Sequence, residues 1–193
     1  DGADVLYWDA SGQLTVTVGV RNNTEQWRGY NYYDPLGRRL VAFFKVNGVW
    51  KSVSLVYDPE HEFLEIGLKA NSSQYWKVFG PDVTGTLGGW NGVGGLEALV
   101  APDDSARGAI NDRFGDIVAG ITSNGTVEWN PARTLSGGLQ PDSTPQYAEL
   151  GGDVLFAHAW RTRRADPTGY IWMGARFLDP RTNSFISPDP LGH

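Results

Sequence analysis

Short stretches in which apolar and polar residues alternate recur along the chain. The clearest is residues 14–18, which read Leu-Thr-Val-Thr-Val, and residues 51–57 alternate less regularly. Alternation with a period of two predicts β-strands that bury one face. No stretch of ten residues has convincing helical periodicity, and the nearest is residues 94–100. The pattern therefore predicts an all-β chain with short turns.

A repeated turn motif separates these stretches. Asp9, Asp34 and Asp58 each follow an aromatic residue, and they stand 25 and 24 residues apart. In the motif Asp-Pro-x-Gly, Pro fixes φ at the second turn position, Asp can bond the backbone two residues on, and Gly allows a positive φ. Each unit therefore predicts a β-hairpin. Weaker copies follow at residues 110–117 and 127–131.

Hairpins stacked in this way bury their apolar face only against their neighbours, so a slice of such a stack has an exposed edge at each end. The first unit begins almost at Asp1. We expect the rest of the same polypeptide, or another copy, to cover that edge. The aromatic residues of the units are Tyr7, Trp8, Tyr32, Tyr33 and Tyr57. We expect them to form inward packing layers, and the alternative is that some of them form a glycan-binding platform.

Composition narrows the possible functions. The chain has 193 residues, 40% of them hydrophobic and 12% aromatic, which indicates a folded protein. A net charge of −6 and the absence of a long basic run argue against a nucleic-acid partner, and no apolar run is long enough to span a membrane. With no Cys and three scattered His, we expect no disulfide, metal or cofactor. The Gly-rich residues 85–95 lack the Lys-Ser/Thr of a phosphate loop.

Three segments resemble a known family. Residues 33–40, Tyr-Asp-Pro-Leu-Gly-Arg-Arg-Leu, are similar to the repeat of RHS/YD-repeat proteins, which include bacterial polymorphic toxins, shell components of insecticidal toxin complexes and animal teneurins. Residues 79–96 resemble the Gly-rich stretch that precedes the terminal core in that family, and residues 166–192 resemble the RHS-repeat-associated core itself. The resemblance implies a β-sheet strip that forms part of a hollow shell, capped by the core. It assigns residues 1–130 to the C-terminal YD repeats and residues 131–193 to the core.

The resemblance also implies a site. In self-cleaving members the core is an intramolecular aspartyl protease with two Asp-Pro-x-Gly motifs, and the matching positions here are Asp166 and Asp189. In this chemistry one carboxylate acts as the base that activates water, while its protonated neighbour polarises the amide. The cut falls just after the second motif, which places it after His193. Arg164 is expected to fix a carboxylate, and Asp179 is expected to be the structural, repeat-like Asp of the core.

Other functions are compatible with the same residues. Asp-Pro-x-Gly is also an ordinary turn, as at Asp34, so Asp166 and Asp189 could serve as turn residues alone. The family resemblance implies a secreted or cell-surface protein that encloses or presents a C-terminal, toxin-like passenger. The alternative is a scaffold of YD repeats at the cell surface or in an assembly, which has no catalytic activity. Such a scaffold could also bind carbohydrate.

Overall fold

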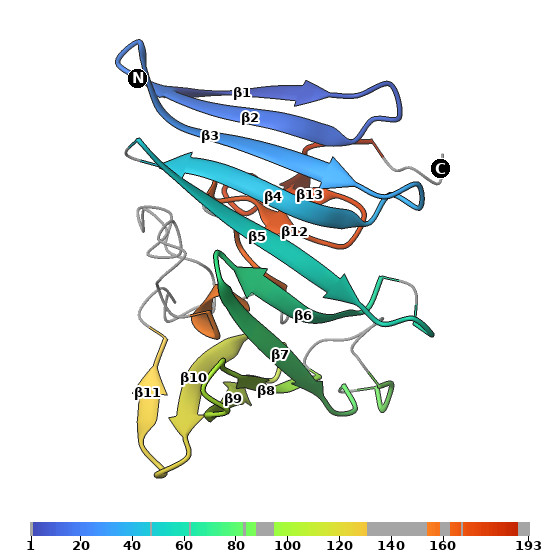
Figure 1. Ribbon diagram of the computed structural model, residues 1–193, viewed down its shortest axis with the longest axis vertical. Helices are drawn as coiled ribbons and strands as arrows, with labels where there is room; N and C mark the ends of the chain where they lie inside the picture. Colours follow the sequence, from blue (N-terminus) through green and yellow to red (C-terminus); the bar gives the residue numbers. More distant parts are fainter. Residues whose placement is uncertain are drawn as a thin grey trace.

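Eleven strands form one antiparallel sheet in which each strand pairs with its neighbours in sequence (Figure 1). The computed structural model describes residues 2–46, 48–61, 63–82, 84–87, 95–130, 154–158, 163–166 and 168–188. We call this sheet the strip. Its strands are β1 (Gly2–Trp8), β2 (Leu14–Arg21), β3 (Thr24–Tyr33), β4 (Arg39–Val46), β5 (Val49–Tyr57), β6 (Glu65–Ala70), β7 (Ser73–Phe79), β8 (Leu96–Val100), β9 (Ala106–Asn111), β10 (Ile117–Thr122) and β11 (Val127–Trp129).

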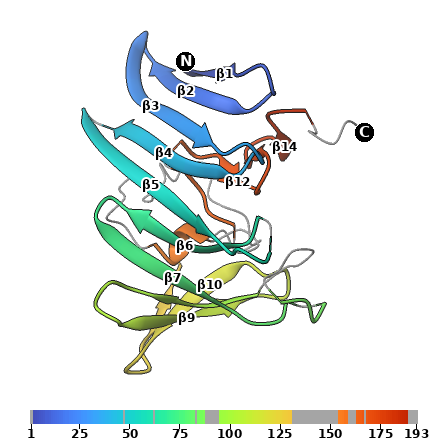
Figure 2. The same ribbon diagram turned by 45° about the vertical axis from the view of Figure 1, so that its right-hand side comes forward.

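A second, smaller unit lies against one face of the strip (Figures 1 and 2). It contains a 3-10 turn, η2 (Phe156–His158), and a three-stranded sheet of β12 (Ile171–Trp172), β13 (Phe177–Asp179) and β14 (Ser184–Phe185). We call the described part of this unit, residues 154–188, the core segment. The prediction of an all-β chain is confirmed. Among the described residues, no helix is long and apolar enough to cross a membrane.

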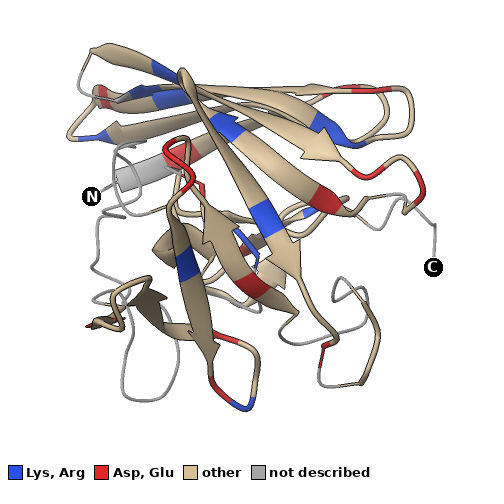
Figure 3. Cartoon of the chain, turned by 60° about the horizontal axis from the view of Figure 1, so that its bottom comes forward, with Lys and Arg blue, Asp and Glu red and all other residues tan. Residues whose placement is uncertain are grey.

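The predicted hairpin turns are present. Asp34 N–H donates to Arg38 O and Gly37 N–H donates to Asp34 O, each at 2.9 Å, so the two ends of β3 and β4 are joined by a closed turn. Gly37 has φ of 83°, a left-handed conformation that glycine adopts without strain. The same turn joins β1 to β2 and β9 to β10, and a longer one follows Asp58. Figure 3 shows acidic residues in several of these loops and basic residues along the strands.

The strip and the core segment share two apolar clusters. In the first, strip residues from β2 to β6 surround Tyr170, Trp172 and Phe177. In the second, Leu96, Leu99 and Ile117 of the strip pack on the core segment around Leu155, Ile171 and Leu178. The core segment therefore packs on one face of the strip, which we call the inner face.

The aromatic residues of the repeats divide between the two faces. Tyr33 and Tyr57 face inward, where their hydroxyls donate to the carbonyls of Leu14 at 2.8 Å and Arg39 at 3.0 Å. Tyr7, Trp8 and Tyr32 are 54%, 43% and 55% exposed, so the prediction of inward packing layers is wrong for these three. Adjacent residues of a strand point to opposite faces, and the described part of the core segment lies against only one face of the strip.

The boundary between the repeats and the core, placed at residues 130–131, stays a prediction. β11 ends at Trp129, and residues 131–153 lie outside the described residues. Residues 88–94, most of the Gly-rich stretch, also lie outside them. The division into residues 1–130 and 131–193 therefore rests on the family resemblance.

Candidate functional site

A short hairpin of the core segment presents Asp166. Ala165 pairs with Ile171 across the hairpin, and Arg164 O accepts a hydrogen bond from Trp172 N–H at 3.1 Å. Asp166 N–H donates to Tyr170 O, and Gly169 N–H donates to Asp166 O, each at 2.8 Å. The backbone turn at Asp166 is therefore the same turn that closes the hairpins of the strip.

The Asp166 side chain behaves differently from the other turn aspartates. Asp34 Oδ1 accepts the N–H groups of Leu36 and Arg38, both at 2.9 Å, and Asp9, Asp82 and Asp112 bond their own turns in the same way. Among the described residues, the Asp166 carboxylate contacts guanidinium groups instead. Its carboxylate points out of its own turn and into the interface with the strip.

Arg39 of β4 is the main partner of Asp166. Its Nη1 donates to Asp166 Oδ2 and its Nη2 donates to Oδ1 at 3.1 Å, which makes a bidentate pair between positions 127 residues apart. The two side chains are 0% and 1% exposed. The guanidinium also lies 4.9 Å from the ring centre of Trp172 and 5.1 Å from that of Phe177. The strip thus supplies a buried, rigidly packed cation to a carboxylate of the core segment.

Arg164 also lies beside this carboxylate. Its Nη2 is 3.0 Å from Asp166 Oδ1, and its side chain is 4% exposed. This is the position in which we predicted a supporting arginine. Asp179 lies elsewhere: it accepts the N–H of Arg181 at 2.9 Å and pairs with the Arg181 guanidinium, as a turn aspartate does. Asp189 and His193 lie outside the described residues, so the separation of the predicted catalytic pair is not described.

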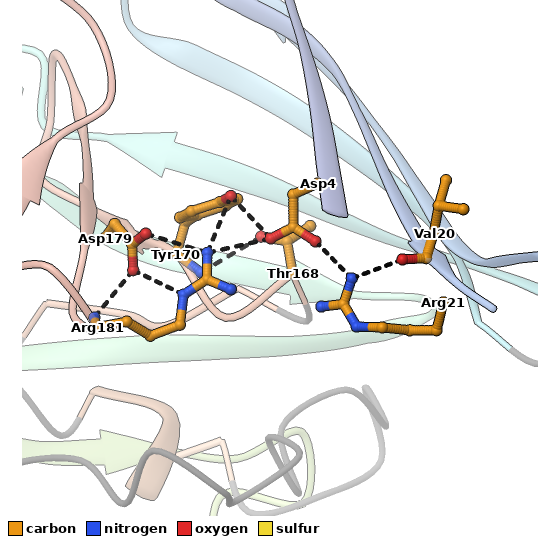
Figure 4. Close-up of polar contacts among 7 residues, drawn as sticks. All are labelled: Asp4, Val20, Arg21, Thr168, Tyr170, Asp179 and Arg181. Atoms are coloured by element: carbon orange, nitrogen blue, oxygen red, sulfur yellow. Dashed lines mark hydrogen bonds and ion pairs between the residues drawn. The ribbon is translucent and has the colours of Figure 1, made fainter. Parts of the chain in front are cut away.

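A second polar contact holds the core segment to the first strand of the strip (Figure 4). Tyr170 donates its hydroxyl hydrogen bond to Asp4 Oδ2 at 3.0 Å, and Arg181 Nη2 lies 3.1 Å from the same oxygen. Arg21 of β2 pairs with the other carboxylate oxygen of Asp4 at 3.1 Å. Because Tyr170 also ends the Asp166 turn, Asp4 ties that turn to the strip at a second place.

Another ion pair lies near Arg164. Lys77 Nζ of β7 donates to Glu65 Oε1 of β6 at 2.5 Å, and the side chains are 5% and 11% exposed. Burial alone would raise the pKa of Glu65, but the charges of Lys77 and Arg164 outweigh it and hold that pKa at about 2. Burial lowers the pKa of Lys77 despite the carboxylate beside it. Both shifts are expected where cations outnumber carboxylates.

The low pKa of Glu65 predicts a pH dependence of stability. Because the folded-state pKa lies below the ordinary value of 4.5, the stabilisation is present above pH 4.5 and is lost as the pH falls towards 2. Glu65→Gln cannot titrate there. We expect wild type to exceed this variant by about 2 to 3 kcal/mol at pH 6 and the gap to close by pH 2, measured by urea unfolding. A gap that stays constant with pH would contradict the assignment.

Among the described residues, no group of three or more His, Asp or Glu side chains could hold a metal ion. The polar centre of the molecule is instead the Arg-Asp contact between the strip and the core segment.

Comparison with known proteins bears on the fold. No protein-family model matches the sequence, and no curated protein matches it. Solved structures do match. The crystal structure of TcdB2-TccC3 has a TM-score of 0.61 and 16% identity over 98% of this chain. A structure of the Photorhabdus luminescens Tc holotoxin pore has a TM-score of 0.62 and 15% identity over 98% of this chain.

The chain shares the fold of these Tc toxin chains. It covers only 9% of the length of each, so what it matches is a small part of a much larger polypeptide. At 15–16% identity the likeness speaks for the fold and not for the activity. It agrees with the sequence-based expectation of an all-β strip of stacked hairpins that forms part of a shell.

Sequence reasoning missed three residues of this centre. Arg39, Glu65 and Lys77 lie in strands of the strip, and none belongs to a recognised motif of the core. For Arg39 a signal was present: it follows Arg38 in the repeat, and successive strand residues point to opposite faces. Since Arg38 pairs with Asp34 of its own turn at 2.7 Å, Arg39 had to face the interior.

Proposed function

We propose that the chain is the shell-and-plug module of an RHS/YD-repeat protein, which encloses or presents a C-terminal, toxin-like passenger and releases it by aspartyl autoproteolysis after His193. The fold shared with Tc toxin chains supports the shell part of this proposal. The motif resemblance of residues 166–192 supports the protease part. Such a protein acts outside the cell or at its surface, and the rest of its own polypeptide, or a second copy, continues the sheet.

The observation that carries the proposal is the orientation of the Asp166 carboxylate. An aspartate that served only its turn would accept backbone N–H groups, as Asp34 does, but Asp166 points into a buried contact with Arg39 and Arg164. Two guanidinium groups contact this carboxylate and hold it in place. Asp166 therefore suits the base of an aspartyl pair, and Asp189 is assigned the role of the protonated partner.

The remaining residues position this carboxylate. Arg39 hydrogen-bonds both of its oxygens, and Arg164 lies within ion-pair distance of one of them, so the carboxylate has little freedom to rotate. Because the substrate belongs to the same chain, the fold itself sets a high effective concentration and no turnover is needed. Asp179, paired with Arg181, keeps the turn of the core segment and has no part in the chemistry.

Autoproteolysis is tested by expressing the chain with its native downstream extension. Wild type is expected to give two fragments with a new terminus after residue 193, identified by mass spectrometry. Asp189→Asn and Asp166→Asn are each expected to give one intact chain, because an amide can act neither as base nor as acid. Asp34→Asn is the matched control, since Asp34 occupies the same type of turn in the strip, and it should still cleave.

Folding must be separated from chemistry in this experiment. Asp166→Asn leaves two buried guanidinium groups without a carboxylate, so its fold is checked by tryptophan fluorescence and by urea unfolding. Asp189→Asn does not remove the partner of Arg39 and serves as the cleaner chemical variant. An intact, folded wild-type chain would overturn the protease part of the proposal and leave the shell part standing.

A scaffold without catalysis is the second candidate function, and the partners of the Asp166 carboxylate favour it. Both carboxylate oxygens already have cationic partners, and a buried Arg-Asp pair can serve only to dock two elements. Exposed aromatic residues on the outer face, such as Tyr7 and Tyr32, would then contact an assembly partner or a glycan. Oligomers that persist on dilution without clipping would favour this function.

A further inference from the structure

A small cavity lies between β6, β7 and the core segment, beside the Asp166 contact. Its volume is about 20 Å³, and its lining includes Tyr57, Glu65, Lys77, Arg163, Arg164 and Trp172. A cavity needs roughly 10 to 15 Å³ of this kind to admit one water molecule. The space therefore admits only a group of the size of one or two water molecules, and it excludes a sugar ring or a nucleotide.

Cations outnumber carboxylates around this cavity. Arg163, Arg164 and Lys77 line it together with one carboxylate, Glu65. The neighbouring pair of Arg39 and Asp166 is neutral as a whole, so it compensates none of these charges. Among the described residues the cavity therefore carries an excess of two positive charges. Uncompensated buried charges destabilise a fold, so such an excess calls for a negative group.

His158 does not change this balance. Its Nδ1 lies 2.8 Å from Val154 O, and since a carbonyl only accepts, Nδ1 carries the proton. Burial, reinforced by the charge of Lys77, lowers the pKa of His158 well below its ordinary value, so the ring is neutral. The excess positive charge therefore belongs to the two arginines and the lysine.

Two donor atoms of Arg164 at the cavity make no hydrogen bond within the described part of the chain. Nε and Nη2 of Arg164 are buried and make no hydrogen bond, although Nη2 lies in ion-pair range of Asp166. The Arg164 side chain is 4% exposed, so bulk water does not serve these atoms in place of a protein acceptor. Burial lowers the pKa values of both Arg163 and Arg164, which agrees with a shortage of nearby carboxylates.

We infer that this cavity, lined by Lys77, Arg163 and Arg164, is a binding site for a single carboxylate-type anion. A planar carboxylate matches the fork of a guanidinium group and provides acceptors for the unpartnered donors of Arg164. One bound carboxylate halves the excess charge and fits the available volume. A metal cation would be repelled by the three positive side chains. The anion is either free in solution, with formate as its smallest representative, or a carboxylate of the protein's own chain.

Formate binding is the first arm of the test. At pH 7 and constant ionic strength, sodium formate is expected to raise the thermal midpoint of the wild-type chain by roughly 3 °C at ten times its dissociation constant, with saturation. Arg163→Gln, which removes a half-buried lining cation, should weaken formate binding at least tenfold. Arg113→Gln removes an exposed arginine of the β9–β10 turn and should respond like wild type.

The second arm detects a carboxylate supplied by the chain. If one occupies the site, formate has no saturable effect, but carbon-13 NMR of the Asp and Glu carboxyls should find one more group with a lowered pKa besides Glu65 and the turn aspartates, whose pKa values are lowered by the hydrogen bonds of their own turns. Arg163→Gln should return that pKa towards normal. Neither a saturable formate effect nor such a carboxyl would overturn the inference. Both readouts are independent of whether the chain cleaves itself.

Discussion

Replacement of Arg39 by methionine is expected to lower the free energy of unfolding by about 3 to 5 kcal/mol, which is the range for breaking a buried ion pair by removal of one partner. The substitution leaves the Asp166 carboxylate, 1% exposed, without its bidentate partner. It also removes a cation that packs on the rings of Trp172 and Phe177. Urea unfolding followed by tryptophan fluorescence measures the loss.

Arg38→Met is the matched control, because it removes the same chemical group from the next residue. Arg38 pairs with Asp34 in its own turn, and its side chain is 23% exposed. We expect this variant to lose under about 1 kcal/mol, as partly exposed pairs do. Equal losses of unfolding free energy in the two variants would show that the contact between Arg39 and Asp166 stabilises the fold no more than the contact between Arg38 and Asp34 does.

Replacement of Trp172 by alanine should cost about 3 to 5 kcal/mol, as for other large aromatic residues in a core. Trp172 is 4% exposed and stacks on Tyr33 and Phe177, at 5.9 and 4.8 Å between ring centres. Its loss opens a void between the core segment and the strip. Chemical denaturation gives the change in stability, and exposure of the inner face should increase the binding of a hydrophobic dye.

Trp129→Ala provides the comparison for this prediction. Trp129 lies in β11 and is 74% exposed, so its removal creates no buried void. We expect a change within about 0.5 kcal/mol, which is usual for surface positions. If Trp172→Ala were as mild as Trp129→Ala, the strip would be stable without the packing of the core segment.

The hairpins of the strip could be predicted because their determinants are local. In the turn at Asp34, the acceptor, the donors and the glycine with positive φ all lie within five residues. The role of Asp166 could not be predicted in the same way, because its backbone turn is identical to these. The partner that draws its side chain away from the turn, Arg39, lies 127 positions earlier.

The orientation of the aromatic residues shows a second limit. The sequence places an aromatic pair ahead of the turn in two units, at residues 7–8 and 32–33, and hydrophobicity alone favours burial of both members. A strand directs neighbouring side chains to opposite faces, so at most one member can face the core segment. Tyr33 does so, while Tyr32 stacks edge to face with Phe43 on the outer surface.

The order of the strands in the strip determines when the contact between Arg39 and Asp166 can form. Because each strand pairs with the one before it, the strip can assemble hairpin by hairpin as the chain leaves the ribosome. The contact between Arg39 and Asp166 joins positions 127 residues apart, so it cannot form before all eleven strands of the strip have been synthesised. We therefore expect any reaction at Asp166 to take place only after the strip is complete, so that folding determines when the reaction occurs.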